Sequence, residues 1–209
     1  MANLLHILAA PRGRDVSRTL KVTEAFLEAY RDSHPDAKIE SVNLFTGSLP
    51  RFDIELLSAK YKDWQGGEKT AAEGAKWAKV EALIDQFLSA DGYLVSAPMW
   101  NFNIPYELKH YIDCIVHAGK TFDMSRKPPG LVEGRKMVVC TARGGFYGEG
   151  SPFAPFNYQE NYLRCIFGFI GITDITFCVA EPTDHGSPEQ QREGMKAAIA
   201  AAGEAARRF

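Results

Sequence analysis

Cysteine is scarce in this sequence, and its spacing shows no paired pattern. The 209 residues include four cysteines, Cys114, Cys140, Cys165 and Cys178, and none belongs to a CxxC pair. Each lies in an apolar stretch, as reduced core thiols usually do. A disulfide framework is therefore not expected, and the thiols indicate a cytoplasmic protein.

Long hydrophobic runs are also absent. No stretch reaches the roughly 20 apolar residues that a helix needs to cross a bilayer. The apolar run near the N-terminus ends at Pro11 and Arg12 and has no basic residues before it, so it is too short for a signal peptide. We expect no membrane association and a cytoplasmic location.

No strong charge of one sign is present. The chain has 24 Lys plus Arg and 26 Asp plus Glu, a formal net charge of −2, which offers no electrostatic footprint for nucleic acid or an anionic membrane. Hydrophobic residues make up 45% and charged residues 24%, the balance of an ordinary globular chain. The length suits one domain, and the 11% of aromatic residues hints at an interface or a planar ligand.

Three common catalytic signatures are missing. Neither GxGxxG nor GxxxxGK occurs in the first predicted loop, which argues against a dinucleotide-binding Rossmann site and against a P-loop nucleotidase. Ser151 has no GxSxG motif around it, so a hydrolase nucleophile is not expected.

What the sequence does contain is an alternation of strand-like and helix-like segments. Apolar runs of strand length are expected to form strands at 4–10, 38–42, 92–97, 136–141 and 175–180, and a helical pattern follows each of them. The segment with Pro50 and the Gly66-Gly67 pair is expected to be a long loop. Five strands and five helices in alternation predict a doubly wound parallel sheet with helices on both faces.

Ligands of doubly wound sheets bind at the carboxyl ends of the strands, so the loops after the first, third and fourth strands are the candidate site. The first loop places Ser17, Arg18 and Thr19 at the start of a helix, where backbone amides favour an anion such as phosphate. A plain serine N-cap would explain Ser17 equally well.

The loop after the third strand is rich in aromatic and amide side chains. Met99, Trp100 and Phe102 alternate with Asn101 and Asn103 where the chain leaves the sheet. Such a loop suits a flat heteroaromatic ring, with apolar faces for the ring and amides for its polar edge. The alternative is that the aromatic side chains merely fill the gap between strand and helix.

The loop after the fourth strand contains Gly144 and Gly145. Two adjacent glycines remove side-chain obstruction, so their N–H groups can approach a carbonyl or a negatively charged ring. Taken alone, this is an ordinary turn.

Together, three motifs resemble a known family. They are Ala97-Pro98-Met99-Trp100-Asn101-Phe102-Asn103-Ile104 followed by Leu108-Lys109, then Arg143-Gly144-Gly145, and finally Gly168-Phe169-Ile170-Gly171-Ile172. Their order and spacing look like those of the FMN-dependent NADH azoreductases, also described as NADH:quinone oxidoreductases, of the flavodoxin-like superfamily. The resemblance spans nearly the whole chain.

The resemblance implies a flavodoxin-like sheet of order 2-1-3-4-5 in a single domain over residues 1–209. It also implies an FMN site, in which the phosphate, the isoalloxazine and its pyrimidine edge meet different loops. The implied site residues are Ser17, Arg18 and Thr19 around the phosphate, Met99, Trp100, Asn101 and Phe102 around the isoalloxazine, and Ala142, Arg143, Gly144 and Gly145 at the pyrimidine edge. Ala10 and Pro98 are further implied FMN-binding residues.

Two positions depart from the family pattern. Serines are common where this chain has Ala10 and Ala142. The loss of two ordinary hydrogen bonds, each contributing about 0.5 to 1.5 kcal/mol, would weaken FMN binding rather than abolish it. Trp100 replaces a common tyrosine and keeps a planar aromatic wall.

The function implied by the resemblance is hydride transfer from NADH through FMN to a quinone or an aromatic azo compound, in a ping-pong cycle. NADPH is also possible as donor. No protein side chain is nominated as catalytic, because the cofactor carries the chemistry. The family is homodimeric, and aromatic residues near Phe122, Phe146, Tyr147, Phe153 and Phe156 suit the interface.

Other interpretations remain open at this point. The same scaffold could serve a flavodoxin-like electron carrier, although a charge of −2 is weak for docking, or a flavin-free binding module. His110, Cys114 and His117 are expected on a helix face away from the core as a partial zinc-ligand set, but no fourth ligand is evident and no metal is expected. Asp184 and His185 are interpreted as turn and cap residues.

Overall fold

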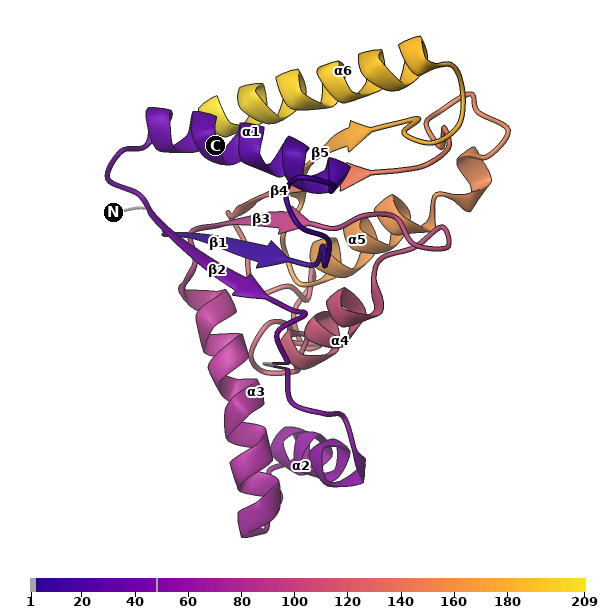
Figure 1. The fold of residues 1–209 in the computed structure, drawn as a ribbon. Coiled ribbons are helices and arrows are strands. Elements are labelled where there is room, and N and C mark those ends of the chain that lie inside the picture. Colours follow the sequence, from indigo (N-terminus) through magenta and orange to yellow (C-terminus); the bar gives the residue numbers. More distant parts are fainter. Residues whose placement is uncertain (1–2, 48) are drawn as a thin grey trace.

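The computed structural model describes residues 3–47 and 49–209, and its centre is a five-stranded parallel sheet of order β2-β1-β3-β4-β5 (Figure 1). The strands are β1 (Asn3–Leu8), β2 (Lys38–Asn43), β3 (Gly92–Ser96), β4 (Lys136–Ala142) and β5 (Asp174–Ala180). The helices are α1 (Arg18–Ser33), α2 (Ile54–Gln65), α3 (Ala71–Ser89), α4 (Tyr106–Ile115), α5 (Tyr158–Phe169) and α6 (Pro188–Arg207), with a short 3₁₀ turn at Ala154–Phe156. The predicted flavodoxin-like fold and strand order are confirmed.

The strand register brings three loops to one place. Leu8 of β1 lies beside Ser96 of β3, which in turn lies beside Cys140 of β4. The strand order reverses between β1 and β3, and this is where doubly wound sheets bind their ligands. The loops after β1, β3 and β4 therefore leave the sheet side by side at its carboxyl edge.

Helices cover both faces of the sheet (Figure 1). The face under α1 and α6 is packed by Phe26 and Ala202, while the opposite face is packed by Leu108 of α4 and Phe167 of α5. Every residue of β3 is buried, as its apolar sequence predicts for a central strand. Within residues 3–47 and 49–209, no helix combines the length and the hydropathy needed to span a membrane.

Helix α2 corrects the prediction of a long loop between β2 and α3, so the sheet is accompanied by six α-helices rather than five. Asp53 caps its first turn by accepting a hydrogen bond from the Leu56 amide, and Gly66 ends it in the left-handed conformation at φ 71°. Most of its apolar side chains face outward: Ile54 is 87% exposed and Trp64 61%. The helix therefore lacks the buried stripe by which the other helices were predicted.

The predicted orientation of Cys114 is wrong. Its side chain is fully buried among Leu56, Trp77 and their neighbours, because α4 packs on α2 and α3, and this burial raises the pKa of the thiol to about 12. His117 follows the end of α4, and its Nδ1 lies 2.8 Å from the carbonyl of Ala118. In the part of the chain that the structure describes, no cluster of His, Cys, Asp and Glu side chains could hold a metal ion.

The cysteines also differ from one another in burial. Cys140 and Cys178 are buried, free thiols, as predicted, and the burial of Cys114 agrees with the core thiols expected from its apolar surroundings rather than with the exposed helix face, whereas Cys165 on α5 is exposed. The expectation of four core thiols is therefore wrong at Cys165.

Candidate functional site

A cavity of about 240 Å³ opens at the carboxyl edge of the sheet, where the loops after β1, β3 and β4 meet. Most of the predicted site residues line it, namely Ala10, Ser17, Arg18, Thr19, Pro98, Met99, Trp100, Ala142 and Gly144. Four residues that were not predicted also line it: Pro11, Arg12, Thr183 and Asp184. Asn101, Phe102, Arg143 and Gly145 are not among its lining residues.

One end of the cavity is the N-terminus of α1. The Ser17 side chain accepts a hydrogen bond from the Leu20 amide at 3.2 Å, so the interpretation of Ser17 as an N-cap is correct. The amides of Arg18 and Thr19 have no acceptor within the helix, and they add to the positive end of its dipole. The first turn contains no acidic residue that would oppose an anion.

Arg18 and Asp184 form an ion pair on the rim of this end. Both side chains are substantially exposed, so the pair contributes little to stability. It keeps a guanidinium at the helix N-terminus, and it also places a carboxylate there, whose charge opposes an anion.

The loop after β3 contains a tight turn. Trp100 and Asn103 exchange two backbone hydrogen bonds, of 2.8 and 2.9 Å, across Asn101 and Phe102. Both central residues have positive φ, 47° and 69°. Asparagine tolerates this conformation, but for phenylalanine it costs about 1–3 kcal/mol, and such costs concentrate at functional sites.

The two aromatic side chains of this turn take different directions. Trp100 lines the cavity and packs edge-on against Phe45, with their ring centroids 6.0 Å apart. The ring of Phe102 instead lies 5.3 Å from that of Phe156 and 6.0 Å from that of Tyr147. Trp100 is therefore placed as a wall of the cavity, whereas Phe102 joins an aromatic cluster beside it.

Gly144 brings backbone to the cavity from the loop after β4, and Gly145 follows it in that loop. The Gly144 carbonyl accepts from the amides of Asp184 and His185 at 3.0 and 2.9 Å, which holds the loop in place. A Cβ on Gly144 would lie 3.1 Å from Asp184 Oδ2, so the close approach of the two loops favours glycine. Among the described residues, no hydrogen bond occupies the amides of Gly144 and Gly145.

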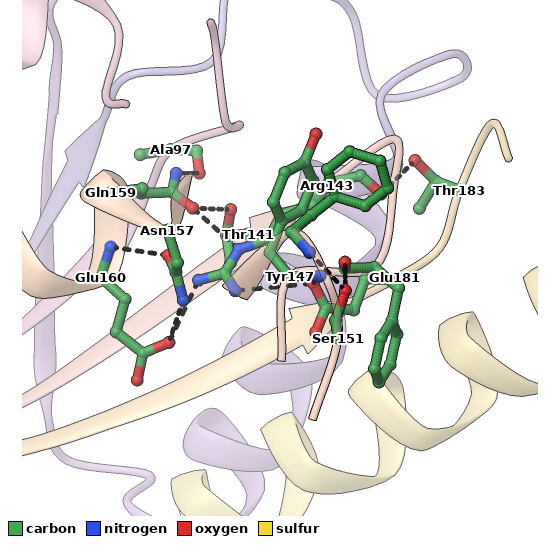
Figure 2. Close-up of polar contacts among 12 residues, drawn as sticks. Ala97, Thr141, Arg143, Tyr147, Ser151, Asn157, Gln159, Glu160, Glu181 and Thr183 are labelled. Carbon is green, nitrogen blue, oxygen red and sulfur yellow. Dashed lines mark hydrogen bonds and ion pairs between the residues drawn. The ribbon is translucent and has the colours of Figure 1, made fainter. Parts of the chain in front are cut away.

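The side chain of Arg143 is buried beneath this loop (Figure 2). Its guanidinium lies 3.1 Å from Gln159 Oε1, 3.2 Å from Glu160 Oε2 and 3.5 Å from Glu181 Oε2. Burial raises the pKa of Glu160, but hydrogen bonds from Arg164 and Arg143 outweigh it, and the pKa is lowered overall. Arg143 therefore anchors the glycine loop from below.

The chain is similar to several known proteins over nearly its whole length. A family model described as a flavodoxin-like fold matches residues 2–205. The FMN-dependent NADH:quinone oxidoreductase of Nitratidesulfovibrio vulgaris (strain DP4) is 40% identical over 190 residues, which are 90% of each chain. That of Nostoc sp. (strain PCC 7120) is also 40% identical, over 97% of this chain and 98% of its own.

A solved structure adds the cofactor. The crystal structure of an FMN-dependent NADH-azoreductase from Bacillus anthracis str. Ames Ancestor, in complex with FMN, matches with a TM-score of 0.89 and 34% identity, over 100% of this chain and 99% of its own. The chain belongs to the FMN-dependent NADH:quinone oxidoreductase and azoreductase family, within the flavodoxin-like fold.

Several residues of this family member's site were not predicted from sequence. Thr183 and Asp184 line the cavity from the segment after β5, and Gln159, Glu160 and Glu181 surround Arg143. None belongs to a recognisable motif. The sequence offered no signal for these partners, because the burial of Arg143, which requires carboxylate or amide partners, is seen only in the structure.

The interpretation of Asp184 and His185 as turn residues is correct for their backbone, since both amides donate to the Gly144 carbonyl. Neither caps α6. Ser187 does so, by accepting a hydrogen bond from the Gln190 amide.

Proposed function

We propose that this chain is an FMN-dependent oxidoreductase that transfers hydride from NADH to a quinone or an aromatic azo compound, with the cofactor at the carboxyl-edge cavity. The observation that carries the proposal is the meeting, in one cavity, of a helix N-terminus, an aromatic wall at Trp100 and a glycine loop with available amides. These three features match the three chemically distinct parts of FMN: phosphate, fused rings and a polar ring edge.

The residues present fit this cofactor. The first-turn amides of α1, with Ser17 and Thr19, would hold the phosphate, and Arg18 would contribute a positive charge. Met99 and Trp100 would lie against the isoalloxazine, with its pyrimidine edge toward Gly144 and Gly145. When bound, FMN supplies the ability to accept a hydride from NADH and to pass it to an oxidant.

The chain's own contribution is to position and to stabilise charge. The Gly145 amide shares a peptide unit with the Gly144 carbonyl, which accepts from Asp184 and His185. The Gly144 amide shares a peptide unit with the Arg143 carbonyl, which accepts from the amide and the hydroxyl of Thr183. Both amides are thus held in place, so they need not reorganise when negative charge develops at the ring edge. We assign no side chain as a proton donor or nucleophile. NADH and the oxidant would use the same open side of the cavity in turn, which corresponds to a ping-pong cycle.

Steady-state kinetics test this cycle. With NADH and a soluble quinone varied together on the FMN-loaded protein, the proposal predicts parallel double-reciprocal lines. Intersecting lines would indicate that both substrates bind at once. Negligible turnover with NADH, together with fast reduction by a partner reductase, would identify an electron carrier instead.

A second copy of this chain is the proposed partner. Phe146, Phe153 and Phe156 are 49%, 55% and 43% exposed. The rings of Phe153 and Phe156 pack with those of Tyr147 and Phe102, and Phe102 lies two residues after Trp100, which lines the cavity. Clustered exposed aromatic side chains are typical of interface centres rather than of free surface. We infer that a homodimer covers this cluster and completes the wall of the cavity.

Sedimentation velocity tests the dimer. The wild-type chain of 23.2 kDa should sediment at about twice that mass, and Phe153→Asp should shift it toward the monomer. A matched control is Tyr158→Asp, which places the same charge at another exposed aromatic residue outside the cluster. Equal behaviour of the two variants would contradict the inferred interface.

A further inference from the structure

Gln159 connects the two sides of the candidate FMN site. It is the second residue of α5, it is fully buried, and it lies outside the cavity lining (Figure 2). The site needs two separate loops, which we call the aromatic wall (97–103) and the glycine wall (142–147), at a fixed spacing. Gln159 touches both.

Its hydrogen bonds to the aromatic wall come from two different groups. The side-chain Nε2 donates to the Ala97 carbonyl at 3.1 Å, where the chain leaves β3. The backbone N–H donates to the Phe102 carbonyl at 3.0 Å, within the tight turn. Because this N–H belongs to the first turn of α5, it has no intrahelical acceptor, and the turn satisfies it.

The same side chain also reaches the base of the glycine wall. Its Oε1 accepts from Thr141 Oγ1 and from Arg143 Nε, each at 3.1 Å. These two residues flank Ala142 at the end of β4. One planar amide thus bridges Ala97 to both neighbours of Ala142.

The orientation of this amide is determined by its partners. Thr141 and Arg143 present donors, and Ala97 presents an acceptor. A reversed amide would place its NH₂ against the guanidinium and its oxygen against a carbonyl, leaving buried groups unsatisfied. The bridge therefore has one arrangement.

The far end of the glycine wall is held separately. Glu181 Oε2 accepts from the Tyr147 amide at 3.1 Å and lies 3.5 Å from the Arg143 guanidinium. Gly144 and Gly145 thus lie between two residues, Arg143 and Tyr147, that hydrogen bonds and ion pairs hold in place. Two contacts relate the glycine wall to the aromatic wall: the Met99 amide donates to the Ala142 carbonyl at 3.2 Å, and Gln159 is the side chain that bridges them.

We propose that Gln159 is a positioning residue that sets the spacing between the aromatic wall and the glycine wall, and thereby the affinity for FMN. This inference rests on the proposed function for the identity of the ligand. The spacing itself is a property of the chain, so it can be measured without a cofactor.

The primary test compares Gln159→Met with Tyr93→Phe. Methionine keeps the volume of Gln159 and removes its side-chain hydrogen bonds. Tyr93 provides the matched control, because its buried hydroxyl also bridges two groups, Phe87 O at 2.9 Å and Arg135 Nη1 at 2.8 Å, but near the opposite, amino end of β3. Both variants should lose similar thermal stability.

Two readouts separate positioning from general destabilisation. FMN titration of the apoprotein should give a dissociation constant at least tenfold higher for Gln159→Met and within twofold of wild type for Tyr93→Phe. Amide hydrogen exchange without FMN should be faster in both walls of Gln159→Met and unchanged there in Tyr93→Phe. Binding of FMN by Gln159→Met within twofold of wild type, or equal weakening in both variants, would overturn the proposal.

A second variant remains informative if Gln159→Met does not fold. Gln159→Glu retains the acceptor for Thr141 and Arg143, removes the donor to Ala97 and places a carboxylate oxygen against that carbonyl. Exchange should then accelerate in 97–103 and stay as in wild type in 142–147. Unchanged exchange in 97–103 would refute the bridge. If the wild-type protein fails to bind FMN, the proposed function fails, and the exchange experiment still decides the role of Gln159.

Discussion

At the scale of single residues, small side chains decide how closely a ligand can approach the sheet edge. Ala10 and Ala142 both line the cavity, at positions where the resemblance to this family leads us to expect serine. An alanine methyl group offers no hydrogen bond. A serine at either position would add a hydroxyl that could hydrogen-bond FMN, with little change in side-chain size.

Ala142→Ser should therefore tighten FMN binding. One additional ordinary hydrogen bond corresponds to about a two- to tenfold lower dissociation constant. Fluorescence titration of the apoprotein measures it. Ser17→Ala is the opposing variant, because it removes a hydroxyl and a helix cap and should weaken binding. An Ala142→Ser protein that binds FMN no more tightly than wild type would show that the ligand does not reach this residue.

A buried histidine makes the stability depend on pH. His6 on β1 lies 2.8 Å from Ser96 Oγ and 3.3 Å from Ser41 Oγ through its two ring nitrogens. Burial, with the charges of Arg14 and Arg31, lowers its pKa from 6.5 to about 4. Between pH 6.5 and pH 4, His6 is therefore protonated in the unfolded chain and neutral in the folded chain. The free energy of unfolding consequently falls as the pH drops through this range.

Denaturant unfolding at pH 7 and pH 4.5 checks this effect. Between these conditions, wild type should lose about 2 kcal/mol more than His6→Gln, since one unit of pKa shift is about 1.4 kcal/mol. His185→Gln, a change at an exposed histidine, should keep the wild-type dependence. A His6→Gln protein with the same pH dependence as wild type would contradict the assignment.

The sequence predicted which loops form the site, because the course of the backbone determines this. It did not predict the direction in which individual side chains point. The glycine loop and the helix start could be located from sequence, because loops after parallel strands meet at one edge. Arg143 could be assigned to the right loop but not to the buried side of it. Its direction depends on Glu160 and Glu181, which approach from distant segments of the chain.

At the scale of elements, α2 is the helix that the periodicity of apolar residues did not predict. The other helices bury an apolar stripe, such as Trp77, Val80, Ile84 and Phe87 of α3, and that stripe predicts them. In α2 only Leu56 and Ala59 are buried. Its signals are at its ends, the Asp53 cap and the left-handed Gly66, and these local signals also occur in loops.

Two glycines at α2 and α3 should respond to alanine in opposite ways. Gly66→Ala should destabilise the protein by about 1 kcal/mol, because φ at this position is 71°. Gly74→Ala should stabilise it by about 0.5–1 kcal/mol, because Gly74 lies inside α3 with open space where a Cβ would be. Urea unfolding of both variants measures the difference. A Gly66→Ala protein that is not destabilised would contradict the left-handed end of α2, and a Gly74→Ala protein that is not stabilised would contradict the open helical position in α3.

At the scale of the whole molecule, the fold was predictable because alternation leaves few choices. Parallel neighbours require crossover helices of one hand, so five apolar runs separated by helices predict a doubly wound parallel sheet. The family resemblance, rather than the alternation, implied its order β2-β1-β3-β4-β5. The position of the site follows from that topology. The proposed dimer interface does not follow from the topology. Its exposed aromatic cluster is formed by separate loop segments that come together only in the folded chain.

The proposed function requires that the cavity at the carboxyl edge binds FMN and passes electrons from NADH through it. Absorbance spectroscopy of the purified, FMN-supplemented and desalted protein under anaerobic conditions tests it most directly. We predict a retained flavin band that bleaches on addition of one equivalent of NADH and returns on addition of a quinone. A protein that retains no flavin after desalting and takes up none on titration would contradict the account.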